Sequence, residues 1–161
     1  MESNKYLLRK DEIDVMKGDV KAHFLNENAV CTSKVLGDPT GLTGIGVSII
    51  EIPPGRDSTE PHLHHREDEC VYVLSGEGAA QIGNDTVAIA EGDFLGYRKG
   101  GLPHGITNTG EKLLRCLVIG QRGDTDLVDY PEKDIRMFRT KGVDWNVMDR
   151  EDIRPRAKRT P

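Results

Sequence analysis

The distribution of glycine is the feature of this 161-residue sequence that most restricts its fold. Of the 18 glycines, 16 lie between positions 37 and 123, where they and other turn residues separate short apolar runs. No helical period of useful length crosses this stretch, and short apolar runs between tight turns are typical of antiparallel strands. We therefore predict an all-β sandwich or barrel, which must curl because strands twist and open edges aggregate.

The turns between the apolar runs support this assignment. Residues 75–78, 83–85, 91–93 and 108–110 all include glycine, asparagine or aspartate, which tolerate a positive φ. The strands that we predict span residues 45–52, 70–74, 79–82, 86–90, 94–97 and 113–119.

The segments on either side of the glycine-rich region differ from it in composition. Residues 1–36 and 124–161 are more polar, and their scattered apolar side chains indicate that they are docked and not free. We predict one barrel domain over 37–123, flanked by irregular N- and C-terminal arms that pack on their own barrel or cross to a second subunit. A basic tail over 151–161 is expected to be solvated and not to bind phosphate.

Charge and composition argue against several classes of protein. The formal net charge of -5 argues against a nucleic-acid partner. No run of about 18 apolar residues is present, so we expect no membrane-spanning helix. The first residues lack the apolar core of a secretory signal, so we expect a cytoplasmic protein. Cys31, Cys70 and Cys116 are far apart and odd in number, which argues against a disulfide frame or a thiolate zinc site.

Four of the five histidines lie in the glycine-rich region. His62 and His64 are two residues apart, so in an extended chain both imidazoles leave the same face, as neighbouring ligands of one metal must. Glu69 follows a polar stretch that can loop back, and His104 can approach from a non-adjacent strand of the barrel. This set suits a divalent transition metal (iron, manganese, nickel, cobalt or zinc), and an octahedral ion would keep two positions open for water or substrate.

These residues fall into two patterns that match a known family. The sequence resembles both motifs of the cupin superfamily, which read here Gly55-x6-His62-x-His64-x4-Glu69-x6-Gly76 and Gly92-x8-Gly101-x2-His104-x3-Asn108. Residues 36–43, 66–76 and 128–131 are similar to a mostly uncharacterised group of small single-domain bacterial cupins, some of them labelled sugar-phosphate-isomerase-like. The resemblance implies a double-stranded β-helix of the jelly-roll type, a metal at its mouth, and commonly a homodimer.

The second motif departs from the family pattern just before His104. Where the family usually has a proline, a small residue and a glycine, this chain has Arg98-Lys99-Gly100-Gly101, with one extra residue. We therefore expect a turn of different shape. Arg98 and Lys99 would anchor a phosphate or carboxylate of a substrate, although charged residues in turns are usually just solvated. Tyr97 is a further catalytic candidate as a proton donor, against the alternative of packing.

The residues that surround the predicted ligands are assigned lesser roles. His65 should leave the chain on the side opposite to His64, as a surface residue or as a contact behind the ligands. Glu67 and Asp68 are expected to be solvated charges of a loop.

The function that we favour is a metal-dependent enzyme acting on a small, oxygen-rich molecule. Isomerase-like chemistry is preferred, because of the two cations and because of the label that some cupins carry. Two alternatives stay open, a metal-dependent dioxygenase and a non-catalytic module that binds a metal or a small ligand. A regulator that binds DNA through a separate module is disfavoured, because neither arm shows a helix-turn-helix pattern.

Overall fold

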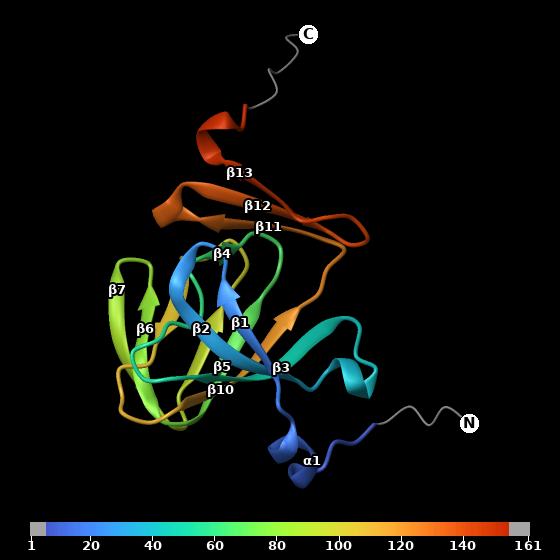
Figure 1. Cartoon of the computed structure of the whole chain (residues 1–161). Helices are drawn as coiled ribbons and strands as arrows, with labels where there is room; N and C mark the ends of the chain where they lie inside the picture. Colours follow the sequence, from blue (N-terminus) through green and yellow to red (C-terminus); the bar gives the residue numbers. More distant parts are fainter. Residues whose placement is uncertain (1–5, 155–161) are drawn as a thin grey trace, which may run out of the picture.

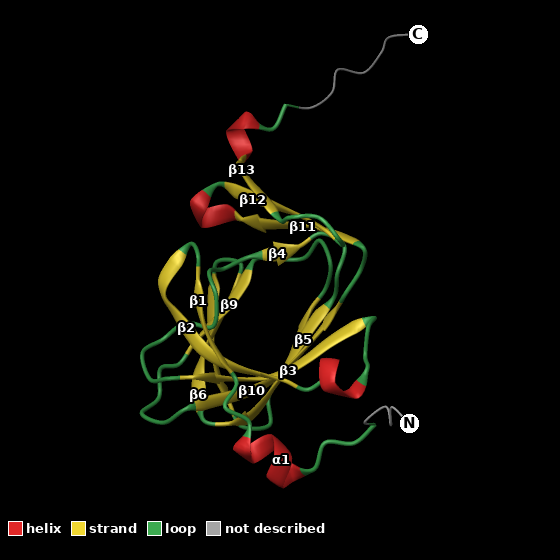
Figure 2. Ribbon diagram, turned by 45° about the vertical axis from the view of Figure 1, so that its right-hand side comes forward, coloured by secondary structure: helices red, strands yellow, loops and turns green. Residues whose placement is uncertain are grey.

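Two antiparallel sheets that face each other form the body of the protein. The computed structural model describes residues 6–154 (Figures 1 and 2). One sheet has six strands in the order β1-β2-β3-β10-β5-β8, and the other has three in the order β7-β6-β9. A third sheet, in the order β13-β12-β11-β4, lies across one end. This architecture confirms the predicted jelly-roll double-stranded β-helix.

The strands are β1 (Asp19–His23), β2 (Asn26–Val35), β3 (Ile45–Ile52), β4 (Leu63–His64), β5 (Glu69–Ser75), β6 (Glu77–Ile82), β7 (Asp85–Ala90), β8 (Phe94–Tyr97), β9 (His104–Thr107), β10 (Leu114–Gln121), β11 (Thr125–Tyr130), β12 (Ile135–Thr140) and β13 (Asn146–Asp149). The helices are α1 (Lys10–Val15) and three 3-10 turns, η1 (Asp38–Thr40), η2 (Pro131–Lys133) and η3 (Arg150–Asp152). Among the described residues, no helix is long and apolar enough to cross a membrane.

The apolar core lies between the six-stranded and the three-stranded sheet. Ile52, Val73 and Leu114 of the larger sheet and Ala80 of the smaller one are fully buried. In β5, Val71 and Val73 point inward while Tyr72 is exposed, as the predicted alternation requires. Fully burying a side chain of this size stabilises the fold by about 1.5–3 kcal/mol, so this core holds the two sheets together.

All six predicted strands are present. β3 and β8 have the predicted bounds, and the other four differ by one or two residues at their ends. The turn after β5 shows why glycine is needed there: Gly76 has a φ of +89°, and a Cβ at this position would lie 2.7 Å from the carbonyl oxygen of Leu113.

Within residues 6–154 the flanking segments are largely built of strands, which corrects the expectation of irregular arms over 1–36 and 124–161 for the described part. β1 and β2 extend the six-stranded sheet, and β11, β12 and β13 form the sheet at its end. Their apolar alternation is weak because the inward positions of β2 include Ser33, and those of β11 include a buried aspartate, Asp126. Residues 155–161, most of the predicted basic tail, lie outside the described residues.

The C-terminal segment packs on its own barrel, one of the two predicted placements. β11 pairs with β4, so that Val128 lies opposite His64 and Asp129 opposite Leu63. A small second core of Val128, Tyr130 and Met137 lies beneath this sheet. In Figure 1 the C-terminal strands, in orange and red, form a layer above the ring of barrel strands. The strand that carries His64, β4, is therefore itself the edge strand of this C-terminal sheet, on the side of the barrel.

Candidate metal centre

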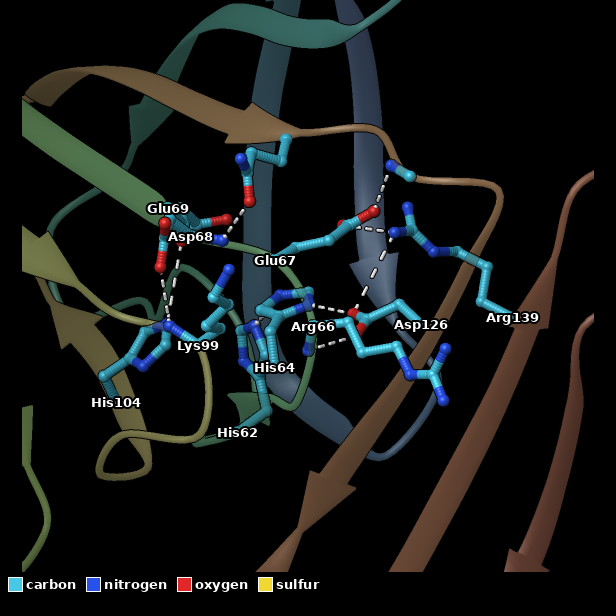
Figure 3. A network of polar contacts seen from close by, with 12 residues as sticks. His62, His64, Arg66, Glu67, Asp68, Glu69, Lys99, His104, Asp126 and Arg139 are labelled. Atoms are coloured by element: carbon cyan, nitrogen blue, oxygen red, sulfur yellow. Dashed lines mark hydrogen bonds and ion pairs between the residues drawn. The ribbon is translucent and has the colours of Figure 1, made fainter.

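The four predicted ligands converge at one end of the barrel. His62 and His104 pair through their backbones, each donating its N–H to the other's carbonyl, at 3.1 and 2.8 Å. His62 Nε2 lies 3.2 Å from His64 Nε2, and His104 Nε2 lies 3.7 Å from Glu69 Oε1. Figure 3 shows the three imidazoles and Glu69 gathered at one side of a larger polar network.

The outer nitrogen of each imidazole is already engaged. His62 Nδ1 lies 3.0 Å from the carbonyl oxygen of Glu60, and His104 Nδ1 lies 3.2 Å from that of Leu102. A carbonyl oxygen only accepts hydrogen bonds, so these two Nδ1 atoms carry the proton and the Nε2 atoms present lone pairs. His64 Nδ1 lies 2.6 Å from Asp126 Oδ2. All three Nε2 atoms are therefore free to face the centre.

The donor set fits a metal ion. Ligand atoms about 2.1 Å from a tetrahedral or octahedral ion lie roughly 3.0–3.4 Å from one another, close to the two separations measured here. His104 Nε2 is buried and has no hydrogen-bond partner among residues 6–154. A buried polar atom without a partner is costly, and a cation between the imidazoles and Glu69 would satisfy it.

The ionisation states of His62 and Glu69 also suit metal binding. Burial lowers the pKa of His62 to about 4, so its imidazole is neutral at neutral pH. Burial alone would raise the pKa of Glu69, but the nearby imidazoles of His104, His62 and His64 lower it, so the carboxylate is ionised. Neutral imidazole and ionised carboxylate are the forms that bind a metal.

His64 differs from His62 because of its carboxylate partner. Burial opposes protonation of His64, yet the hydrogen bond with Asp126 and the charges of nearby carboxylates raise its pKa. A carboxylate that accepts from the outer nitrogen also fixes the orientation of an imidazole and increases its basicity towards a metal.

Tyr97 is the one predicted catalytic candidate that faces the ligand set. Its ring stacks on His104 with centroids 3.7 Å apart and planes within 5°. Its hydroxyl is buried and has no partner among the described residues, and burial raises the pKa of this group. Tyr97 therefore offers a neutral hydrogen-bond donor at neutral pH.

Arg98 and Lys99 are exposed, and neither is among the residues that line the cavities at the ligand set. Their turn lies next to the ligands through its backbone, but these two side chains do not line the cavity there.

The backbone of the Arg98–Gly101 turn accounts for the extra residue in the second motif. Gly101 donates its N–H to the carbonyl of Arg98 at 3.0 Å, and Gly100 has a φ of +65°. Gly100 N–H donates to the carbonyl of His64 at 2.7 Å, and Lys99 N–H donates to Asp68 Oδ1 at 2.8 Å. The turn therefore fastens the strand of His64 through backbone hydrogen bonds.

A cavity in two compartments opens at the ligand set. The inner compartment has a volume of about 250 Å³ and is lined by His62, Tyr97 and His104 together with apolar side chains. The outer compartment measures about 380 Å³ and is lined by His64 and several charged side chains. The residues that line both are Lys21, Ser33, Ile50, Glu69 and Val118. The predicted ligands thus lie where the two compartments meet.

Three charged residues behind His64 support this ligand, and the sequence did not predict that role for them. Asp126 and Glu67 are 1% and 5% exposed, and the guanidinium of Arg139 forms an ion pair with Glu67 and lies 3.9 Å from Asp126 Oδ2. The N–H of Gly123 also donates to Glu67 Oε1 at 2.6 Å. The expectation that Glu67 is solvated is therefore wrong, because β12 supplies an arginine that compensates its burial. Figure 3 shows this cluster on the far side of His64.

A second group of possible ligands lies in this cluster. Single ligand atoms of His64, Glu67 and Asp126 lie within 4.8 Å of one another. Arg139 already provides a cation to both carboxylates, and His64 would have to bind through the nitrogen that contacts Asp126. We therefore regard this cluster as the support of His64 and not as the metal centre.

His65 points away from the centre, on the side predicted for it. Its Nε2 lies 3.0 Å from Asp129 Oδ2, and Arg136 binds the same carboxylate with two nitrogens at 2.6 and 2.8 Å. Burial opposes ionisation of Asp129, but these hydrogen bonds lower its pKa to about 2. His65 thus links the ligand strand to the C-terminal sheet.

Residues 48–120 match the family model of the cupin domain. Over 104 residues the chain is 32% identical to the oxalate-binding protein of Thermotoga maritima. The aligned region covers 64% of this chain and 76% of that protein.

Two solved structures resemble nearly the whole chain, flanking segments included. A candidate sugar phosphate isomerase from Acidithiobacillus ferrooxidans is 50% identical, with a TM-score of 0.91 over 96% of this chain and 98% of that one. A sugar phosphate isomerase of the cupin superfamily from Silicibacter pomeroyi is 24% identical, with a TM-score of 0.77 over 91% and 94% of the two chains, and shows the same fold.

Proposed function

The chain belongs to the cupin family, and we propose that it is a metal-dependent enzyme acting on a small, oxygen-rich molecule, with isomerase-like chemistry on a sugar phosphate preferred. In this proposal His62, His64, Glu69 and His104 hold a divalent transition metal, which is iron, manganese, nickel, cobalt or zinc. The observation that carries it is the buried Nε2 of His104, which has no hydrogen-bond partner in the described part of the chain and lies near Glu69 among imidazoles whose outer nitrogens are all engaged.

The chain's own residues would divide the remaining work. A bound metal of this kind supplies Lewis-acid stabilisation of negative charge on a substrate oxygen. Tyr97 donates a hydrogen bond from its hydroxyl to another oxygen of a substrate in the inner compartment. Val71, Ile106 and Val118 line the same compartment and keep water from its walls. Asp126 holds His64 in its orientation.

Support for the isomerase preference comes from relatives and not from the predicted cations. The 50% identical protein from Acidithiobacillus ferrooxidans carries that description and matches nearly the whole chain. Arg98 and Lys99 give the preference no support, because they are exposed and lie outside both compartments.

A second candidate function is non-catalytic binding of a small ligand. The relative from Thermotoga maritima is named an oxalate-binding protein. Apart from the predicted ligands and Tyr97, the titratable side chains that line the inner compartment are those of Lys21 and Cys31. Binding without turnover would use the same metal and the same cavity.

Turnover assays separate these functions. We expect protein loaded with each of the five metals in turn to interconvert aldose and ketose phosphates with at least one of them. Tyr97→Phe should lower kcat by roughly 100-fold while metal content is unchanged, because only the hydroxyl donor is lost. Tight binding without product across the panel would favour the binding module, and oxygen consumption with a diketone would favour the dioxygenase alternative.

We also propose that the protein forms a homodimer. Tyr72 and Phe94 lie opposite each other on β5 and β8, on the outer face of the six-stranded sheet, and are 44% and 65% exposed. Exposed aromatic pairs of this kind are enriched at interfaces. Light scattering should give twice the mass of the chain, and Phe94→Glu should shift the mass towards the monomer.

A further inference from the structure

The outer compartment is lined by three cationic side chains, of which two are already paired. Arg122 Nη1 lies 2.5 Å from Asp38 Oδ1, and Arg139 forms an ion pair with Glu67. The third is Lys21, for which the structure gives no hydrogen bond and no ion pair with any of residues 6–154. Lys21 is therefore the cation of this cavity that is available to a ligand.

The position of Lys21 in the sheet directs its side chain to the cavity. Lys21 on β1 lies directly opposite Cys31 on β2, so both side chains leave the same face of the sheet. Cys31 and Ser33 line the inner compartment on that face. Lys21 is exposed and lines both compartments, as Glu69 does, so it lies where the two compartments meet.

The other end of the cavity offers an uncharged donor. Tyr97 is on β8, at the opposite edge of the six-stranded sheet from β1, and its buried hydroxyl has no partner in the described part of the chain. Lys21 and Tyr97 thus present a cation near the opening and a neutral donor deep inside, with the ligand set close to both. A ligand that satisfies both carries a negative charge at one end and an uncharged oxygen elsewhere.

We propose that Lys21 determines substrate specificity by binding an anionic oxygen group, a carboxylate or a phosphate, of a short substrate. The inference rests on the proposed function, because it assigns a charge and a size to the molecule that reaches the metal. An inner volume of about 250 Å³ lies just below the usual range of ligand pockets, roughly 300–1,000 Å³, so the part of the substrate inside this compartment is small. A neutral molecule of the same length leaves Lys21 unpaired and binds more weakly.

Calorimetric titration of the purified full-length chain, with its metal content measured, tests this role. The probes are oxalate, dihydroxyacetone phosphate and uncharged dihydroxyacetone. Lys21→Met keeps the apolar stem and removes the charge, and Lys17→Met is the matched control, because Lys17 is exposed and lines neither compartment. We expect Lys21→Met to weaken binding of at least one charged probe by about tenfold or more, since charge-assisted hydrogen bonds are the strong ones.

The controls separate this inference from the metal assignment. Dihydroxyacetone should bind Lys21→Met and the unaltered protein equally, and Lys21→Arg should restore most of the affinity for the charged probe. Metal content and thermal unfolding should be the same in all three proteins. The probe that loses affinity shows whether the group is a carboxylate or a phosphate. Equal affinities of Lys21→Met and Lys17→Met for both charged probes would overturn the role of Lys21. The assignment of the metal ligands fails on a different result, which is that variants of those ligands keep the metal.

Discussion

The barrel and the C-terminal sheet are both antiparallel, yet they bury different kinds of residue. The barrel core is almost wholly apolar, with Ile52, Val73 and Leu114 fully buried. The C-terminal sheet buries two aspartates, Asp126 and Asp129, and compensates each with an arginine and a histidine. Buried carboxylates need such partners, because desolvation of a charge is costly. The barrel thus supplies stability, whereas the C-terminal sheet fixes the orientation of the histidines of the site.

The largest expected effect concerns the barrel. Leu114→Ala should lower the free energy of unfolding by about 2–5 kcal/mol, because it leaves a cavity in a fully packed core. Leu113→Ala is the matched control, since Leu113 is 47% exposed and should change stability by less than about 0.5 kcal/mol. Urea denaturation measures both. If both variants lost the same free energy of unfolding, the core would not be the source of the stability.

The next effect concerns the carboxylate behind His64. Asp126→Asn keeps the shape of the side chain but weakens its hold on His64 Nδ1, so metal affinity should fall about 10- to 100-fold. Asp149→Asn, an exposed aspartate on β13, is the control. Competition with a chromogenic chelator measures the affinity. If Asp126→Asn binds metal as tightly as the control variant, the C-terminal sheet does not orient the site.

The smallest expected effect is the pH dependence of the stability that Asp129 contributes. Its folded pKa, about 2, lies below the ordinary value of 3.8, so its contribution to stability is present above pH 4 and is lost as pH falls towards 2. A shift of this size corresponds to about 2 kcal/mol. Asp129→Asn should therefore be less stable than the unaltered protein at neutral pH, and the difference should shrink in acid. Urea denaturation at several pH values measures this difference, with Asp144→Asn, at an exposed aspartate, as the control. A difference in stability between Asp129→Asn and the unaltered protein that stays constant with pH would contradict the role of Asp129.

Much of the barrel could be predicted because its signals are local. The alternation of Glu69, Val71 and Val73, together with the turn glycines, places β5 and its neighbours, and the spacing of His62 and His64 places two imidazoles side by side. These patterns reflect the two-residue period of a strand and need no knowledge of distant partners.

The support of the site could not be predicted in the same way. The partners of His64 and Glu67 are Asp126 and Arg139, which lie on the C-terminal sheet far along the chain. A charged residue on a strand normally indicates a solvated face, and only the packing of β11 against β4 turns Asp126 inward. Lys21 was missed for a related reason, since β1 shows no apolar alternation and is exposed along most of its length.

Metal analysis of purified protein determines whether His62, His64, Glu69 and His104 form a metal centre. Protein prepared without chelator should contain close to one transition-metal ion per chain, and His64→Ala and Glu69→Ala should each lose it, because each removes a donor from the set around His104 Nε2. His23→Ala should keep the metal, since His23 is on β1, is not one of the four predicted ligands, and its Nδ1 accepts a hydrogen bond from the N–H of Leu25. Near-stoichiometric metal that survives both His64→Ala and Glu69→Ala would contradict the account.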